Sequence, residues 1–322
     1  VRRPHPARRV EVTGSDRTDR TDLRRGAAAG IAAYTLWGLF PLVFHQLRDV
    51  AALEVLVHRV IWSFVVVIAV LVVRSDRAWV AVLRTPSRDR TRLAAAAALI
   101  SVNWLVYVWA VGHEHVVEAA LGYYINPLIT VALGVVVLGE RLRSAQIVAL
   151  AFALAAVAVL TVAYGRVPWI SLVLACSFGG YGFLKKAVPV SAGTSLAVET
   201  AILLPAALVG LVAFEATGEA AFLHGPATRD LLLLGLGLVT AVPLVLFAAA
   251  ARRIPLTLLG LLQYLTPTLQ LACGVVVFGE DLPRERLVGF VLVWIALAIL
   301  AVDALRRAPR RPTPTDDPVE LV

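Results

Sequence analysis

Arg59 and Glu199 are ionisable residues within long apolar stretches of this chain of 322 residues. A charge in such surroundings is costly unless it faces protein or water. Arg59 could therefore line a ligand cavity, or it could lock helices together by bonding a carbonyl or an acid. Glu199 could carry a proton, because a carboxyl removed from water can hold one near neutral pH, or it could be the fixed partner of a basic residue.

Aromatic and amide side chains occur in the same apolar stretches. Asn103 and Tyr107 are one helical turn apart on a single face. Aromatic planes with a few amide donors suit a flat, amphipathic small molecule, although Trp and Tyr also mark membrane interfaces. The candidate substrate-binding residues are Trp37, Arg59, Asn103, Trp104, Tyr107, Tyr124, Asn126, Tyr181, Glu199, Gln263 and Tyr264.

Two prolines, Pro127 and Pro267, interrupt apolar stretches at positions 140 residues apart. Proline removes a backbone hydrogen bond and kinks a helix, and a broken turn can expose carbonyls to a cavity. The sequence therefore predicts a helix kink at each proline. The kinks could serve substrate contact or helix bending alone.

Other kinds of chemistry have weaker support in the sequence. His113, Glu114, His115 and Glu118 are of metal-binding types, but without a second motif they favour a polar helix end over a metal site. The sequence contains no phosphate loop, nucleophile elbow or paired-cysteine motif. We therefore expect no metal, no cofactor and no enzymatic activity.

The composition is that of a membrane protein. Hydrophobic residues make up 59% of the chain and charged residues 16%, with a mean hydropathy of +0.81. Cys176 and Cys273 lie in apolar runs, where packing is favoured over a disulfide. A membrane-spanning helix needs about 20 mostly apolar residues. Ten segments qualify: 26–45, 53–73, 93–112, 117–138, 145–164, 167–184, 194–214, 230–251, 256–278 and 286–304.

The chain also contains an internal repeat. The sequence from Tyr124 to Leu142 reappears without a gap from Tyr264 to Leu282, with ten identical positions. Five spans in each copy is an odd number, so the second copy must be inverted relative to the first. The predicted organisation is a disordered tail at 1–25, repeats at 26–164 and 165–305, and a disordered tail at 306–322.

The distribution of basic residues predicts the orientation of the chain. In the ten-span arrangement 24 Lys and Arg residues fall on one side of the membrane and five on the other. The side richer in Lys and Arg is normally cytoplasmic, which places both termini in the cytoplasm. The net charge of +8 therefore needs no nucleic-acid partner to explain it.

Several short strings carry a resemblance to a known family. They are H-R-V-I-W-S at 58–63, N-W at 103–104, E-A-A-L-G-Y-Y-I-N-P-L at 118–128, L-G-E-R at 138–141, Y-G at 181–182, E-T at 199–200 and Q-Y-L-T-P-T-L at 263–269. Over residues 26–304 the chain resembles the RarD permeases, in the EamA branch of the drug/metabolite transporter superfamily. The resemblance implies a ten-helix inner-membrane permease of two inverted five-helix repeats, in a family named for chloramphenicol sensitivity.

These observations together predict an all-α secondary transporter in a bacterial plasma membrane. Its partners would be the lipid bilayer and a small amphipathic drug or metabolite, moved by alternating access and coupled to protons. The alternative is a membrane receptor or scaffold that transports nothing. A scaffold has little need of buried charges at positions related by the repeat, which favours transport.

Overall fold

The computed structural model describes residues 14–84, 88–139, 141–186 and 188–307, and within these ranges every regular element is a helix. Apolar runs form helices in lipid because every backbone N–H and C=O group must then find a partner within its own segment. The long helices are α1 (Gly14–Gly38), α3 (Ala52–Val73), α5 (Arg88–Gly112), α6 (Val116–Leu138), α7 (Ser144–Tyr164), α8 (Trp169–Lys186), α9 (Ala192–Thr217), α10 (Ala227–Ala251) and α13 (Arg284–Arg307). The short ones are α2 (Phe40–His45), α4 (Ala78–Arg84), α11 (Leu256–Leu262), α12 (Leu265–Ala272) and the π-helix η1 (Cys273–Val277).

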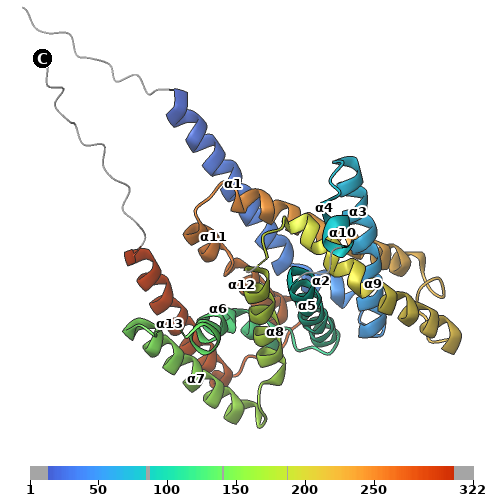
Figure 1. Ribbon diagram of the computed structural model, residues 1–322. Coiled ribbons are helices and arrows are strands. Elements are labelled where there is room, and N and C mark those ends of the chain that lie inside the picture. The colour runs from blue at the N-terminus through green and yellow to red at the C-terminus, as the bar shows by residue number, and fades with distance from the viewer. Residues whose placement is uncertain (1–13, 85–87, 140, 187, 308–322) are drawn as a thin grey trace, which may run out of the picture.

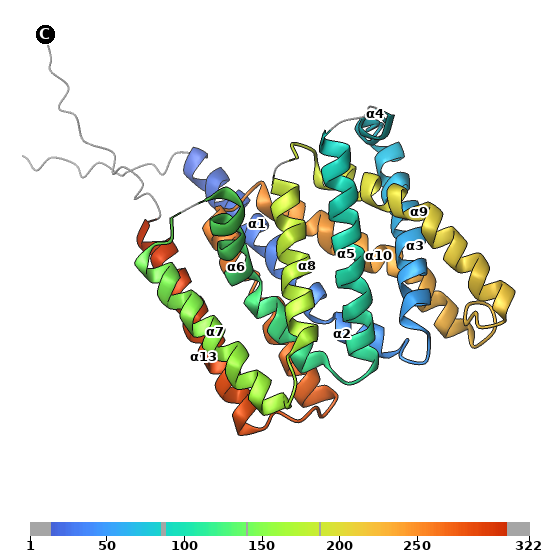
Figure 2. The same ribbon diagram turned by 60° about the horizontal axis from the view of Figure 1, so that its bottom comes forward.

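Nine helical segments of the described chain are long and apolar enough to cross a membrane. They coincide with nine of the ten predicted segments, so the prediction of an all-α membrane protein is confirmed. The segment predicted at 167–184 forms α8, whose last turn carries Lys185 and Lys186. α8 packs against both α5 and α6 (Figure 2).

The helical part of the N-terminus is longer than predicted. α1 begins at Gly14, inside the segment 1–25 that the sequence predicts to be a disordered tail. Once an apolar segment has nucleated a helix, each further residue adds a backbone hydrogen bond, so the helix can extend into polar sequence. α13 likewise runs on to Arg307, into the predicted tail. Residues 1–13 and 308–322 lie outside the described residues.

The strongest helix contacts form a pattern that is kept when each helix is exchanged for the one that corresponds to it in the other half of the chain. α1 of the first half corresponds to α8 of the second, α5 to α10, and α6 to α12. The contact of α6 with α8 thus corresponds to that of α12 with α1, and the contact of α5 with α8 to that of α10 with α1. The counterparts α3 and α9 contact each other, as do α7 and α13 (Figures 1 and 2). This is the pattern expected for two halves related by a twofold axis.

The two prolines have different effects on their helices. α6 is continuous through Pro127, whereas the corresponding stretch of the second half is divided into α11, α12 and η1. The break between α11 and α12 falls at Gln263 and Tyr264, just before Pro267. A proline clashes with the carbonyl four residues earlier and lacks an N–H donor, so Pro267 accounts for the position of this break.

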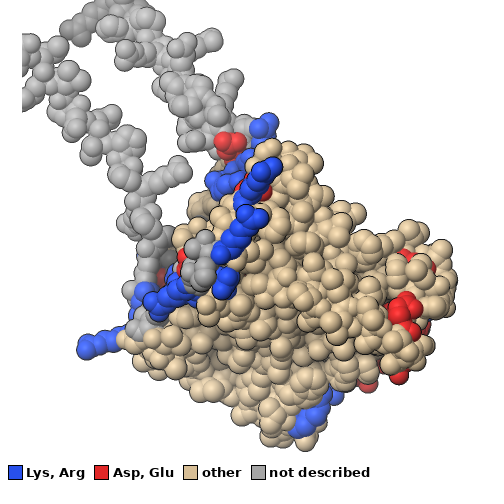
Figure 3. All heavy atoms as spheres, turned by 45° about the vertical axis from the view of Figure 1, so that its right-hand side comes forward, with Lys and Arg blue, Asp and Glu red and all other residues tan. Residues whose placement is uncertain are grey.

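Charged residues are unevenly distributed over the face of the molecule that Figure 3 shows. On the face shown in Figure 3, Lys and Arg gather mainly along one edge and Asp and Glu on the opposite side, with an uncharged surface between them. Large apolar side chains are exposed on the molecule, including Val72, Val136, Val162, Val209 and Val276. An apolar surface of this kind fits a lipid bilayer.

Candidate functional site

Arg59 lies inside the bundle, with 4% of its surface exposed. Its Nε donates a hydrogen bond to Thr240 Oγ1 of α10 at 3.1 Å. The guanidinium carbon lies 4.0 Å from the ring centroid of Trp104, 5.3 Å from that of Phe44 and 5.6 Å from that of Phe40. A cation–π contact is worth about 0.5 to 2 kcal/mol, and a central Arg costs about 2.5 to 3.5 kcal/mol to insert. The rings therefore offset much of the cost of burying Arg59.

Asn103 joins three helices beside Arg59. Its Nδ2 donates hydrogen bonds to the Leu174 carbonyl and to Ser177 Oγ on α8, both at 3.1 Å. The Tyr123 hydroxyl of α6 donates to Asn103 Oδ1 at 3.0 Å. Both polar atoms of the amide thus have protein partners, and Asn103 fixes α5 against α6 and α8.

Tyr107 and Gln270 continue this network. Gln270 Nε2 donates to the Tyr107 hydroxyl at 3.1 Å and to the Trp37 carbonyl at 3.3 Å. The Tyr107 ring meets the rings of Tyr123 and Phe44 edge to face, with centroids 5.7 Å and 5.8 Å away. The structure thus gathers a group of buried and half-buried side chains from both halves of the chain, which we call the central cluster: Trp37, Arg59, Asn103, Trp104, Tyr107, Tyr123 and Gln270.

Glu199 and Tyr181 lie apart from the central cluster, at the end of the bundle where α8 ends. Glu199 Oε1 is 3.0 Å from Lys185 Nζ and accepts a hydrogen bond from Ser195 Oγ at 2.6 Å. The Tyr181 hydroxyl donates to Glu199 Oε2 at 3.1 Å and accepts from Lys185 Nζ at 2.7 Å. Glu199 thus has a basic partner, Lys185. We call Lys185 and Glu199 the inner ion pair.

Four of the predicted binding residues lie outside both groups. Tyr124 faces α12, with its hydroxyl 2.7 Å from Thr268 Oγ1. Tyr264 packs against the same apolar core as Tyr124. Asn126 Oδ1 is buried and has no hydrogen-bond partner among the described residues, and Gln263 follows the last turn of α11.

The sequence analysis missed Tyr123 and Gln270. The repeat singles out Tyr124, because the second copy also has a tyrosine at the matching position, 264. A signal for Tyr123 exists in the helical spacing, since Tyr123 and Asn126 are three residues apart and share a face of α6. That face meets α8, where the Tyr123 ring contacts Phe178.

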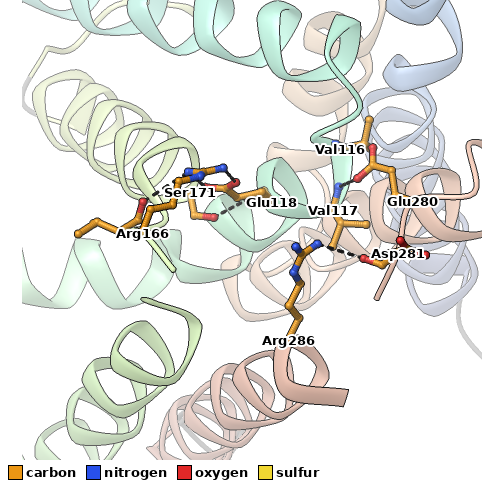
Figure 4. Close-up of polar contacts among 9 residues, drawn as sticks. Val116, Val117, Glu118, Arg166, Ser171, Glu280, Asp281 and Arg286 are labelled. Carbon is orange, nitrogen blue, oxygen red and sulfur yellow. Dashed lines mark hydrogen bonds and ion pairs between the residues drawn. The ribbon is translucent and has the colours of Figure 1, made fainter. Parts of the chain in front are cut away.

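A second polar cluster lies at the other end of the bundle, around the N-terminus of α6 (Figure 4). Two nitrogens of Arg166 lie 2.8 Å and 3.4 Å from the two carboxylate oxygens of Glu118. Glu280 accepts hydrogen bonds from the backbone N–H groups of Val116 at 2.6 Å and Val117 at 2.8 Å. These contacts tie the loops before α8 and before α13 to the first turn of α6.

The same end of the bundle contains a cavity of about 430 Å³. Arg286 stacks on the Tyr164 ring in its wall, with the guanidinium carbon 4.3 Å from the ring centroid. We call the charged residues of this wall the outer polar cluster: Glu114, His115, Glu118, Arg166, Glu280, Asp281 and Arg286.

The predicted alternative of a metal site gains no support from the described part of the chain. Glu118 is paired with Arg166, and His113 Nδ1 is 2.8 Å from the Trp109 carbonyl oxygen. The described residues contain no group of three or more side chains that could hold a metal ion.

Glu54 makes a contact like that of Glu280 at the same end of the bundle. It is fully buried near the start of α3, and its Oε1 accepts hydrogen bonds from the backbone N–H groups of Ala221 at 2.8 Å and Phe222 at 3.0 Å. One turn further along α3, His58 Nδ1 accepts a hydrogen bond from Trp62 Nε1 at 3.2 Å. Glu54 therefore ties α3 to the loop between α9 and α10.

The stability of the outer polar cluster should depend on pH. Burial raises the pKa of Glu280 above its ordinary value, and the N–H groups of Val117 and Val116 lower it only in part. The contribution of docked Glu280 to stability is then present below its ordinary pKa and is lost as the pH rises through the raised one. Glu280→Gln is neutral at every pH, so we expect it to flatten the fall in thermal stability between about pH 4 and about pH 7.

Thermal unfolding in detergent micelles measures this dependence. Asp281→Asn is the matched control, because Asp281 is the next residue and is exposed. It should keep the native pH dependence. An unchanged slope in Glu280→Gln would show that Glu280 does not titrate in this range.

Comparisons with known proteins agree with this architecture, since an all-helical bundle with an apolar surface and charged groups inside is typical of membrane transporters. The model of the EamA-like transporter family matches residues 24–162. "Protein RarD" of Streptomyces exfoliatus is 50% identical over 287 residues, which cover 89% of this chain and 91% of that protein. An uncharacterized transporter of Pseudomonas aeruginosa is 46% identical over 295 residues, 91% of this chain and 98% of that protein.

A solved crystal structure shares the fold. It aligns with a TM-score of 0.57 and 21% identity over 88% of this chain and 98% of the other. The family model and the RarD relative show that the protein is a multi-pass membrane transporter and not an enzyme. The chain belongs to the RarD family of EamA-type transporters, as the sequence motifs predicted.

Proposed function

We propose that this protein is a secondary transporter of the bacterial plasma membrane that moves a small amphipathic drug or metabolite by alternating access. The observation that carries the proposal is the exchange symmetry of the packing, with a buried polar and aromatic cluster between the two halves. Two inverted repeats, at 26–164 and 165–305, can pack in two nearly equivalent ways. Exchange between these packings opens a central site to either side.

The contacts at the two ends of the bundle support such an exchange. The Glu280, Glu118 and Glu54 contacts hold the outer end together, and the inner ion pair joins α8 to α9 at the other end. For either end to open, the residues that form the contacts at that end must move apart. A receptor or scaffold that transports nothing gives no reason for separable contacts at both ends.

We also propose that transport is coupled to protons and that Glu199 is the coupling residue. Glu199 is buried and is held by Lys185, Tyr181 and Ser195, all of which can exchange protons or hydrogen bonds with it. When the inner end opens, Lys185 separates from Glu199, so the carboxylate needs another cation in its place, and a proton can supply it. Protonation would then accompany the change of access.

A flux assay in proteoliposomes tests both proposals. Chloramphenicol is the first probe, because the chain belongs to the RarD family, which is named for chloramphenicol sensitivity. We expect protein-dependent flux that changes when a pH gradient is imposed, by up to about tenfold in accumulation for each pH unit if one proton moves with one molecule. Glu199→Gln should remove the effect of the gradient.

Glu215→Gln is the matched control, since Glu215 lies on the same helix and is exposed, beside His224. It should respond to the gradient as the native protein does. Flux of the native protein that ignores the gradient would refute proton coupling while leaving transport intact.

The orientation with both termini in the cytoplasm is part of this proposal. It is supported by 24 basic residues on one side of the predicted spans against five on the other. A reporter active only in the cytoplasm, fused after Arg25 or after Arg307, should be active at both positions. Activity only of a reporter that works outside the membrane would reverse the orientation.

A further inference from the structure

The charge of Arg59 differs from the other buried charges of the described chain in what surrounds it. Glu199 faces Lys185, and Glu118 faces Arg166. Glu54 is met by two backbone N–H donors. Arg59 has only neutral partners in the described residues, namely a threonine hydroxyl and aromatic rings.

Only part of the hydrogen-bonding capacity of the Arg59 guanidinium is met by the described residues. Its Nε–H bonds to Thr240, while the described chain provides no carboxylate at ion-pair distance for the two terminal nitrogens. Two parallel N–H donors on a planar guanidinium match the oxygens of a carboxylate or sulfonate. A structural hydrogen bond to Thr240 needs a donor but not a positive charge, so the charge of Arg59 calls for a different explanation.

We propose that the molecule transported best carries a single negative charge, which binds the terminal nitrogens of Arg59, and an aromatic or similarly flat apolar body, so that a neutral aromatic probe such as chloramphenicol is a poorer substrate. This inference rests on the proposed transport function and specifies its substrate class. Trp104, Phe44 and Phe40 surround the guanidinium and supply apolar surface for such a body. The central cluster has no second basic residue, so its one positive charge matches a monoanion better than a phosphate ester with two charges.

A pair of probes with the same skeleton tests the charge. 2-Phenylethanesulfonate carries a fixed negative charge, and 2-phenylethanesulfonamide is neutral near pH 7. Titration calorimetry on the protein in lipid nanodiscs measures binding of each probe without requiring transport. We expect the native protein to bind the sulfonate at least about tenfold more tightly than the sulfonamide.

Variants show where that preference comes from. Arg59→Gln should weaken the sulfonate about tenfold and leave the sulfonamide nearly unchanged, whereas Arg59→Lys should keep part of the preference because the charge remains. Arg252→Gln, at the exposed end of α10, should leave the preference intact. The difference between the affinities of the native protein for the two probes tests the inference even if a variant fails to fold.

The inference is overturned if the native protein binds both probes equally or binds neither at millimolar concentration. It is also overturned if the preference survives Arg59→Gln or disappears in Arg252→Gln. Charge-selective binding without any flux in proteoliposomes would uphold this anion site and refute the transport proposal. Flux of neutral probes that is the same in the native protein and in Arg59→Gln would uphold the transport proposal and refute this anion site.

Discussion

Replacing Lys185 by Met is expected to lower the free energy of unfolding by about 3 kcal/mol, because it leaves the Glu199 carboxylate buried without its cation. Glu199 would keep the hydroxyls of Tyr181 and Ser195, which cannot neutralise its charge. Lys185→Met combined with Glu199→Gln removes both charges and should recover most of the loss. Denaturant unfolding of the purified variants in detergent micelles measures the difference.

Lys186→Met is the matched control for this pair. Lys186 is the adjacent residue on α8 and is exposed, so its replacement should change the free energy of unfolding by less than about 0.5 kcal/mol. If the double variant is as unstable as Lys185→Met alone, the side chain of Lys185 matters for packing and not for its charge.

Gly237→Ala is expected to destabilise the protein by about 1 to 3 kcal/mol, because α10 has no room for a side chain at this position. A Cβ atom on Gly237 would collide with the backbone carbonyl of Trp62 on α3, lying 2.6 Å from the carbonyl carbon. Backbone atoms cannot rotate away, so α10 would have to move from α3. Thr240 is three residues along α10, so the same movement should weaken its hydrogen bond to Arg59.

Gly235→Ala provides the control on the same helix. A Cβ atom on Gly235 would meet no other atom within 4 Å, so only helix propensity changes, with a gain of up to about 1 kcal/mol. Thermal unfolding should therefore shift in opposite directions for the two variants. Equal effects would mean that α10 does not contact α3 this closely at Gly237.

Most of the fold was predictable from the sequence, because in a bilayer hydropathy and length determine which segments become helices. The apolar runs located the helices, and family motifs such as the string beginning at His58 identified the family correctly. The burial of Arg59 and Glu199 followed from the cost of exposing a charge to lipid. The helical residues from Gly14 were not predictable in this way, since their sequence has no apolar pattern.

The partners of these residues were decided only by the tertiary structure. The repeat pointed to Tyr124, but the rotation of α6 turns Tyr123 towards Asn103 and Tyr124 towards α12. Gln270, which is 163 positions from Tyr107, joins the central cluster through a contact between the two halves of the chain. Hydropathy is nearly equal on all faces of a buried membrane helix, so the sequence determines that a residue lies in a span. The packing of neighbouring helices then decides which way each side chain faces.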